Sequence, residues 1–398
     1  MNVGRTKKPD ARIDVAYLSR FNIQTYGRDN RYPQNLIAIT SASGTAELCL
    51  ARYAKFVEGF GFVSELASET TINHDGETLD DLLHAIVLDL TRFGGFAVHV
   101  NYNALGEVAS LHHIPFEQVR LSEKDDRGYV ASVKIHPDWQ GGKMTKNGKT
   151  LTLSEREIRE FPIFNPAVEV VQKQIMNSGG IEHYGGQVLW LSTSGKDTYP
   201  TPIYDAAITD ISTDEGLGNI KYRNVRNNFL VACMLITKKR VPEFQEEYND
   251  PIHRDRGNRE TRMISDEDLL QFQGDERGSK ILNVELEDME DEPKVVEFPV
   301  KNFDKDFTAT ESSVIERIYA QFHQEPFYMI RLGKTGFSGT VIRDSYEYYA
   351  GEVTNEQRFI KRGLEAVMHV WHDAAIRDID LTIEPLKYIS SEDNSNVE

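Results

Sequence analysis

The feature that most constrains this chain is a helix, a short connection and a much longer helix, which the sequence predicts over residues 303–371. Apolar residues recur at steps of three, four or seven, so they share one face of each α-helix. The second helix keeps this spacing over about 33 residues, or about 50 Å, more than a small domain needs to close its own core. Gly351 lies inside it and predicts a kink. The apolar positions are Phe303, Phe307, Val314, Ile318 and Phe322, then Ile342, Tyr346, Tyr349, Val353, Ile360, Leu364, Val367 and Trp371.

Residues 324–339 join these helices and are predicted to form a loop. Pro326 disfavours helical geometry at the residue before it, and three glycines in the last seven residues permit backbone angles that other residues resist. We expect the loop to expose apolar side chains beside two cations, Arg331 and Lys334. Two interpretations stay open here: a helical hairpin packed inside an ordinary α-rich domain, and a mobile loop with a function of its own.

Length, charge and cysteine content exclude several classes of protein. A chain of 398 residues can hold two or three domains. Its 45 basic and 63 acidic residues leave a net charge of −18, which argues against tight binding to nucleic acids or anionic membranes. We find no apolar run near the roughly 18 residues of a membrane span and no signal peptide. Cys49 and Cys233 are expected to be buried free thiols in a reducing compartment.

The first half of the chain passes from helical to strand spacing. We interpret residues 1–35 as a polar arm, followed by one helix over residues 36–57 and another over residues 79–93, which Thr78 and Asp81 begin as a capping box. After Gly94 and Gly95, the apolar period changes to two and predicts one antiparallel meander. Its strands are expected at residues 96–102, 108–112, 119–121, 129–136 and 188–191, with an exposed hairpin tip at 141–148.

The second half opens with a long helix predicted from the Tyr199-Pro200-Thr201-Pro202 start to Leu230. Residues 241–300 then hold 18 acidic and 7 basic residues, so most of the excess negative charge lies there. We expect a short helix capped at Ser265, a strand over residues 280–286 and an almost continuous acidic run over residues 285–292. A solvated loop and a functional acidic rim remain equal alternatives for this run.

The chain contains partial motifs of enzymes and metal proteins, but each lacks the neighbouring residues or elements that the motif requires. Gly333-Lys334-Thr335 resembles the end of a phosphate-binding loop, but the earlier glycine and the preceding strand are missing. His112 and His113 alternate along a strand, so their rings point to opposite faces and cannot share a metal. His369 and His372 have helical spacing but no further ligands. We therefore assign no catalytic, cofactor-binding or metal-binding residue and do not expect an enzyme.

The order of the elements, more than any one motif, resembles the portal proteins of tailed bacteriophages over most of residues 30–372. The resemblance rests on four segments between residues 56 and 202, on the helix–turn–strand at residues 265–284, and on two segments within the predicted loop. These are Phe56-Val57-Glu58-Gly59-Phe60-Gly61-Phe62, Gly94-Gly95-Phe96-Ala97-Val98-His99-Val100, Ile114-Pro115-Phe116-Glu117-Gln118-Val119-Arg120, Tyr199-Pro200-Thr201-Pro202, Gln324-Glu325-Pro326 and Gly336-Phe337-Ser338-Gly339.

The resemblance implies an α+β portal fold with a β-rich wing, a two-helix stem, a small α/β clip, a tunnel loop and a long kinked wing helix. By position, residues 1–200 form the N-terminal arm and wing, 201–235 the first stem helix, 236–302 the clip, 303–323 the second stem helix, 324–339 the tunnel loop and 340–373 the wing helix. The remaining tail, residues 374–398, departs from larger portals, which carry a helical crown.

The function implied by the resemblance is a dodecameric ring at one capsid vertex of the virion, assembled in the host cytoplasm. Double-stranded DNA would pass through it without sequence readout. Its partners would be the terminase large subunit, head-tail connector proteins, and major capsid and scaffold proteins, with no membrane and no cofactor. The tunnel loop would present Arg331, Gly333, Lys334, Gly336 and Phe337 to DNA, and the clip would dock basic partners through Glu285, Glu287, Asp288, Glu290, Asp291 and Glu292.

Two other classes of protein stay open. A monomeric adaptor or minor capsid protein would share the acidic α+β character without forming rings. A soluble enzyme would need a pocket with convergent polar groups, which an activity assay on the purified protein would reveal.

Overall fold

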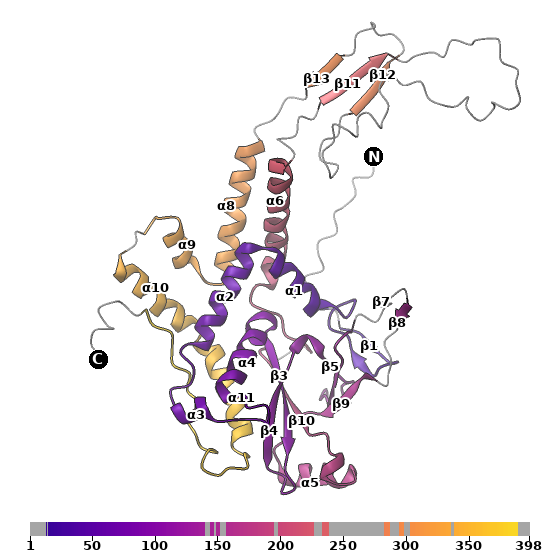
Figure 1. Ribbon diagram of the computed structural model, residues 1–398, viewed down its shortest axis with the longest axis vertical. Helices are drawn as coiled ribbons and strands as arrows, with labels where there is room; N and C mark the ends of the chain where they lie inside the picture. The colour runs from indigo at the N-terminus through magenta and orange to yellow at the C-terminus, as the bar shows by residue number, and fades with distance from the viewer. Residues whose placement is uncertain are drawn as a thin grey trace, which may run out of the picture. The chain divides into compact units, whose positions relative to one another are not determined.

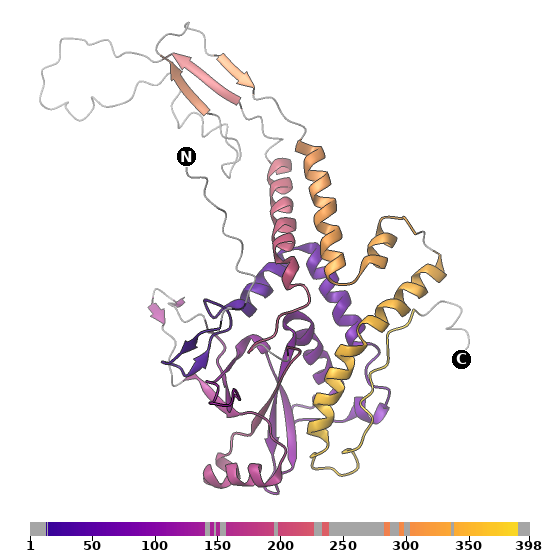
Figure 2. The same cartoon turned by 180° about the vertical axis from the view of Figure 1, so that it is seen from behind.

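The computed structural model describes residues 13, 15–139, 144–146, 149–151, 157–194, 198–226, 233–238, 282–286, 294–297, 303–335 and 338–388. Contacts divide the chain into two units (Figures 1 and 2): unit 1 comprises residues 1–214 and 313–398, and unit 2 comprises residues 215–312. Helices and strands alternate irregularly along the chain, and most strand pairs are antiparallel. The protein is therefore α+β, as the sequence predicts.

In the described residues of unit 1, four helices precede the two three-stranded sheets along the chain. The single helix expected over residues 36–57 is instead two, because Ser43 has extended backbone angles and its side chain accepts a hydrogen bond from the Ala46 N–H, which begins a new helix. The predicted capping box is confirmed: Thr78 and Asp81 each bond the other's backbone. The four helices are α1 (Tyr32–Ala42), α2 (Gly44–Glu58), α3 (Glu65–Glu69) and α4 (Leu79–Phe93).

The strands of unit 1 form separate sheets, so the expectation of one meander was wrong. After β4, Pro115 leads into a 3-10 turn at Phe116–Gln118, which redirects the chain into a second sheet. One sheet has the order β10-β3-β4, from Gln187–Ser192, Gly95–Tyr102 and Val108–Ile114. The other has the order β5-β6-β9, from Val119–Leu121, Ser132–Ile135 and Arg159–Pro162.

Smaller elements complete this part of unit 1. Strands β1 (Tyr17–Leu18) and β2 (Ile23–Gln24) pair near the N-terminus, and β7 (Met144–Lys146) pairs with β8 (Lys149–Leu151) at the expected hairpin. Helix α5 (Val168–Asn177) precedes a 3-10 turn at Ile181–His183. The two adjacent histidines of β4 do diverge: His113 Nε2 lies 2.6 Å from Asp89 of α4, whereas the His112 ring lies 6.4 Å from that of His99.

Several residues of the expected polar arm belong to the core, which corrects that prediction in part. Tyr26 is fully buried and its ring stacks on that of Tyr199, with centroids 4.1 Å apart. Arg120 is also fully buried, and its guanidinium donates to the Asn30 side chain at 2.6 Å and to the Asn30 carbonyl at 2.9 Å. Periodicity could not reveal this packing, because these residues are held by partners distant in sequence.

In the described residues of the last third of the chain there are four helices: α8 (Phe303–Gln321), α9 (Glu325–Arg331), α10 (Gly339–Glu352) and α11 (Thr354–Met368). The single kinked helix expected after residue 339 is two helices, and the break lies at buried Val353 rather than at Gly351. Helix α11 lies against the β10-β3-β4 sheet so closely that a Cβ at Gly363 would stand 2.4 Å from Leu191. The break lets α11 follow the sheet while α10 packs elsewhere.

Helix α6 (Ile208–Arg226) begins later than predicted, after a 3-10 turn at Asp205–Ala207. The chain then forms β11 (Cys233–Lys238), so residues 233–235, assigned above to a stem helix, are a strand. Within unit 2, β11 pairs in parallel with β12 (Leu282–Leu286) and antiparallel with β13 (Lys294–Glu297), which confirms the predicted strand near residue 284. The helix expected after Ser265 lies outside the described residues.

Helices α6 and α8 run antiparallel. In unit 2, the Lys221 ammonium pairs with the Glu311 carboxylate. In unit 1, Arg317 Nη1 lies 3.5 Å from Asp210 Oδ1. Lys221 lies late in α6 and pairs with Glu311 early in α8, whereas Asp210 lies early in α6 and pairs with Arg317 late in α8. The two helices therefore run in opposite directions. In the part of the chain that the structure describes, no helix is long and apolar enough to cross a membrane.

Candidate functional site

The segment between α8 and α10 is only partly the loop that the sequence predicts. Helix α8 does end before Pro326, but Pro326 then occupies the first turn of a new helix, α9, where its missing N–H costs nothing. The chain reverses at His323, whose φ of 56° lies in the left-handed region. Residues 325–331 are therefore helical, and the described residues of the expected loop outside helices are 324, 332–335 and 338.

A buried glutamine holds this connection in place. Gln324 is fully buried, and its Nε2 donates to the Cys49 carbonyl at 2.8 Å and to the Tyr349 hydroxyl at 2.9 Å. Its Oε1 accepts a hydrogen bond from Arg52 Nη1 at 3.2 Å. Gln324 thus ties the start of α9 to α2 and α10. Sequence periodicity gave no signal for this role, since a lone polar residue at a helix end is usually solvated.

The aromatic residues of α9 pack into the core, so the expectation that they are exposed was wrong. The Phe327 ring lies 5.7 Å from that of Tyr349 and 5.8 Å from that of Phe56, and the Arg52 guanidinium covers it at 4.6 Å. Tyr328 is buried, and its ring centroid lies 5.2 Å from that of Tyr319 on α8. Helix α9 is therefore an anchored element.

The cations follow on the exposed side. Arg331 ends α9, and its Nη1 donates to the Tyr319 hydroxyl at 3.3 Å, which together with Tyr319, Cys49 and Tyr328 raises the pKa of the guanidinium. Gly333, with φ of 69°, closes α9 by an N–H bond to the Ile330 carbonyl at 2.9 Å. Lys334 is exposed and has no side-chain partner among the described residues. The structure thus places Arg331, Gly333 and Lys334 together at the end of one helix.

Most of the other predicted site residues lie outside the described part of the chain. Gly336 and Phe337 lie outside the described residues, as do Glu287, Asp288, Glu290, Asp291 and Glu292. Glu285 is in β12, where it pairs with Thr237 of β11. Among the described residues, His, Cys, Asp and Glu form no group suited to a metal ion. Cys49 is a buried free thiol, as predicted, and burial raises its pKa to about 12.

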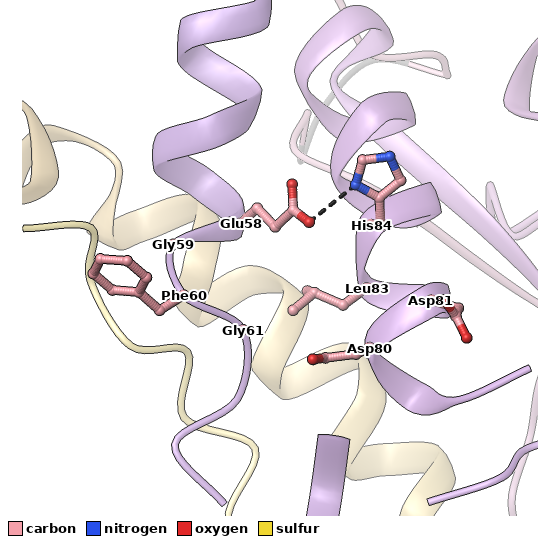
Figure 3. Close-up of a pocket in the computed structure, with 8 residues that line it drawn as sticks. All are labelled: Glu58, Gly59, Phe60, Gly61, Asp80, Asp81, Leu83 and His84. Atoms are coloured by element: carbon pink, nitrogen blue, oxygen red, sulfur yellow. Dashed lines mark hydrogen bonds and ion pairs between the residues drawn. The ribbon is translucent and has the colours of Figure 1, made fainter. Parts of the chain in front are cut away.

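A second candidate, which sequence reasoning missed, is an acidic depression of about 420 Å³ between the end of α2 and the start of α4 (Figure 3). Glu58 and His84 face each other across it, with His84 Nδ1 3.0 Å from Glu58 Oε1. Asp80 points toward Gly61, and its buried Oδ1 finds no hydrogen-bond partner in the described part of the chain. Such a surface suits a basic group.

Comparison with known proteins gives matches among solved structures alone, since no family model and no curated protein matches the sequence. A chain of the virion of the native gene transfer agent (GTA) particle is 12% identical, with 84% of this chain and 81% of that chain covered and a TM-score of 0.45. A chain of the neck of the empty GTA particle, computed with C6 symmetry, is 11% identical, with coverages of 85% and 82% and a TM-score of 0.47.

An HK97 family phage portal protein from Corynebacterium diphtheriae is also similar to this chain. It is 11% identical, with 92% of this chain and 97% of that chain covered and a TM-score of 0.38. These three solved structures are thus of a virion, a particle neck and a phage portal protein.

Proposed function

We propose that this chain is a structural portal subunit: copies form a ring at one capsid vertex, through which double-stranded DNA enters and leaves the particle. The observation that carries the proposal is the course of the chain through α6 and α8. In sequence, unit 2 begins within α6 and ends within α8, so it interrupts unit 1, and α9, α10 and α11 follow α8. This order of elements supports the sequence of wing, stem, clip, stem, tunnel segment and wing helix that the resemblance implies.

In this proposal, residues up to 200 with α10 and α11 form the wing, α6 and α8 the stem, the segment from β11 to residue 302 the clip, and residues 332–339 the tunnel loop. Arg331 and Lys334 would touch DNA phosphates without reading bases. Because the chain is strongly acidic, most of a ring surface would repel DNA, and two cations per copy would hold it briefly. A conduit requires such weak contacts. The proposed role needs no catalytic group.

The acidic segment is proposed to dock basic partners, namely the packaging motor and the connector proteins. Replacing Glu287, Asp288, Glu290 and Asp291 by Asn or Gln should slow association with these partners and flatten its salt dependence. Unchanged association rates would refute this docking role while leaving the ring proposal intact.

The ring is tested by electron microscopy and sedimentation of the purified protein. We expect closed rings with a central hole, twelve copies being the number that the resemblance implies. A protein that stays monomeric at all concentrations and salt conditions, with and without scaffold protein, would favour a monomeric adaptor or minor capsid protein instead.

A further inference from the structure

Two regions of unit 1 carry opposite charges. Residues 56–91 contain eight Asp or Glu and no Lys or Arg. Residues 1–31 contain seven Lys or Arg against three Asp, an exception in a chain with a net charge of −18. We call acidic edge the half-buried Glu58 and Asp80 with the exposed residues Phe60, Val63, Glu65, Leu66, Glu69 and Asp81 of the first region. We call basic edge the exposed residues Val15, Tyr17, Leu18, Arg20, Arg28 and Arg31 of the second.

The acidic edge combines a charged hollow with exposed apolar side chains. The depression of Figure 3 supplies Glu58, Asp80 and Asp81, and α3 adds exposed Glu65 and Glu69. Phe60, Val63 and Leu66 stand beside them with exposed fractions of 45%, 57% and 56%. Asp81 is used by the capping box of α4. The capping role of Asp81 does not explain why Glu65 and Glu69 are exposed on α3. It also does not explain why three apolar residues within seven positions are exposed beside them.

The basic edge offers the complementary combination. Val15, Tyr17 and Leu18 are exposed at and beside β1, and the Arg20 guanidinium lies 5.0 Å from the centroid of the Phe21 ring. Arg28 and Arg31 are exposed at the start of α1. The basic edge has apolar residues beside arginines, and the acidic edge has apolar residues beside carboxylates. If the two edges meet, apolar burial and charge pairing occur in the same contact.

The two edges face in different directions. In Figures 1 and 2, β1 and the start of α1 lie at one side of unit 1 and α3 lies at the other, with the β10-β3-β4 sheet between them. One copy therefore cannot bring its own edges together, but the acidic edge of one copy can meet the basic edge of the next. Contacts between two different surfaces of identical chains generate rings or filaments rather than two-fold dimers.

We propose that the acidic edge is the docking surface for the basic edge of a neighbouring copy of this chain, and that this contact sets the head-to-tail order of subunits. The inference rests on the proposed ring, and it names the surfaces that build it. The occupant is a second copy because charge and apolar character match and because the two edges lie on opposite sides of one unit.

The test reverses the charge of each edge separately. Variant A carries Glu65→Lys and Glu69→Lys, and variant B carries Arg20→Glu and Arg31→Glu. Each alone should assemble with an apparent Kd weakened by about tenfold or more, because like charges would face each other at every contact. An equimolar mixture of A and B should assemble again, since every A–B contact then pairs opposite charges. Sedimentation velocity measures assembly, and thermal melting checks that each variant is folded.

The control matched to variant A reverses two exposed acids outside both edges, Glu169→Lys and Glu182→Lys, with the same change of net charge as variant A. We expect the control to assemble like the unmodified protein. If A and B assemble as well as the control, the inference is wrong while the ring proposal stands. If A and B are folded and weakened but their mixture is not restored, the edges do not meet each other and the inference is equally wrong. Unmodified protein that never assembles overturns both.

Discussion

Gln324 and Tyr349 share a buried hydrogen bond, with Gln324 Nε2 donating to the Tyr349 hydroxyl at 2.9 Å. Tyr349 in turn donates to the Phe322 carbonyl at 3.0 Å, so the end of α8, the start of α9 and the middle of α10 are joined in one network. This network lies directly before the exposed cations of the candidate site. The site thus follows a hydrogen-bonded support, and we expect substitutions to change the stability of the fold and the proposed function of the cations separately.

Gln324→Ala should destabilise the protein by about 1–3 kcal/mol, because it leaves the Cys49 carbonyl and the Arg52 guanidinium without this partner in a buried setting. Thermal or denaturant unfolding measures the loss. Exposed Gln172→Ala on α5 is the matched control and should change stability by less than about 0.5 kcal/mol. Equal effects of the two substitutions would contradict the anchoring role of Gln324.

Phe327 and the pair Arg331 with Lys334 should separate folding from function. Phe327→Ala removes a ring packed on Phe56 and Tyr349 and should cost about 2–4 kcal/mol of stability. Arg331→Ala with Lys334→Ala should leave ring formation unchanged and alter the free energy of unfolding by less than about 0.5 kcal/mol. The double variant should nevertheless retain less DNA in assembled particles.

The control for the cation pair is Arg358→Ala with Arg362→Ala, which removes the same charge from the exposed face of α11. Normal packaging by the Arg331 and Lys334 double variant would show that these cations have no role in the conduit. Failure of that variant to form rings would show that the segment is purely structural.

Arg120→Lys should be strongly destabilising although it keeps the charge. The guanidinium donates to Asn30, to the Glu117 carbonyl at 2.9 Å and to the Val119 carbonyl at 2.8 Å, and an ammonium cannot reproduce this planar set. We expect a loss of about 3 kcal/mol or more, because several buried acceptors lose their donor. Exposed Arg127→Lys serves as the control, and unfolding experiments compare the two. A loss below about 1 kcal/mol would show that the buried arginine does not fasten the N-terminal region.

Asp380 should give the protein a specific loss of stability in acid. Its hydrogen bonds to Lys361, at 2.8 Å, and to Thr382 lower the pKa of the carboxyl from 3.8 to about 2. A lowered carboxyl pKa stabilises the fold above the unfolded value, and this contribution is lost as pH falls through the folded value. The stability difference between the unmodified protein and Asp380→Asn should therefore be constant above pH 5 and shrink toward pH 2. A difference that does not change over this range would contradict the ion pair.

The sequence by itself determined the elements whose signals are local. The capping box of Thr78 and Asp81, the divergence of His112 and His113, the end of α8 before Pro326 and the α+β class follow from side-chain spacing and backbone preference. These act over a few residues and do not depend on distant partners. The order of the elements also sufficed to indicate the resemblance to portal proteins.

Tertiary structure decided what distant contacts control. It placed Tyr26 and Asn30 in the core, because Tyr199 and Arg120 supply their partners from far along the chain. It divided the long C-terminal helix at Val353, where α11 follows the sheet and α10 does not. It turned residues 325–331 of the expected loop into α9, because Gln324 and Phe327 gain buried partners on α2 and α10. Local spacing cannot report such contacts, since the free energy that selects them comes from burial between segments that are adjacent only after folding.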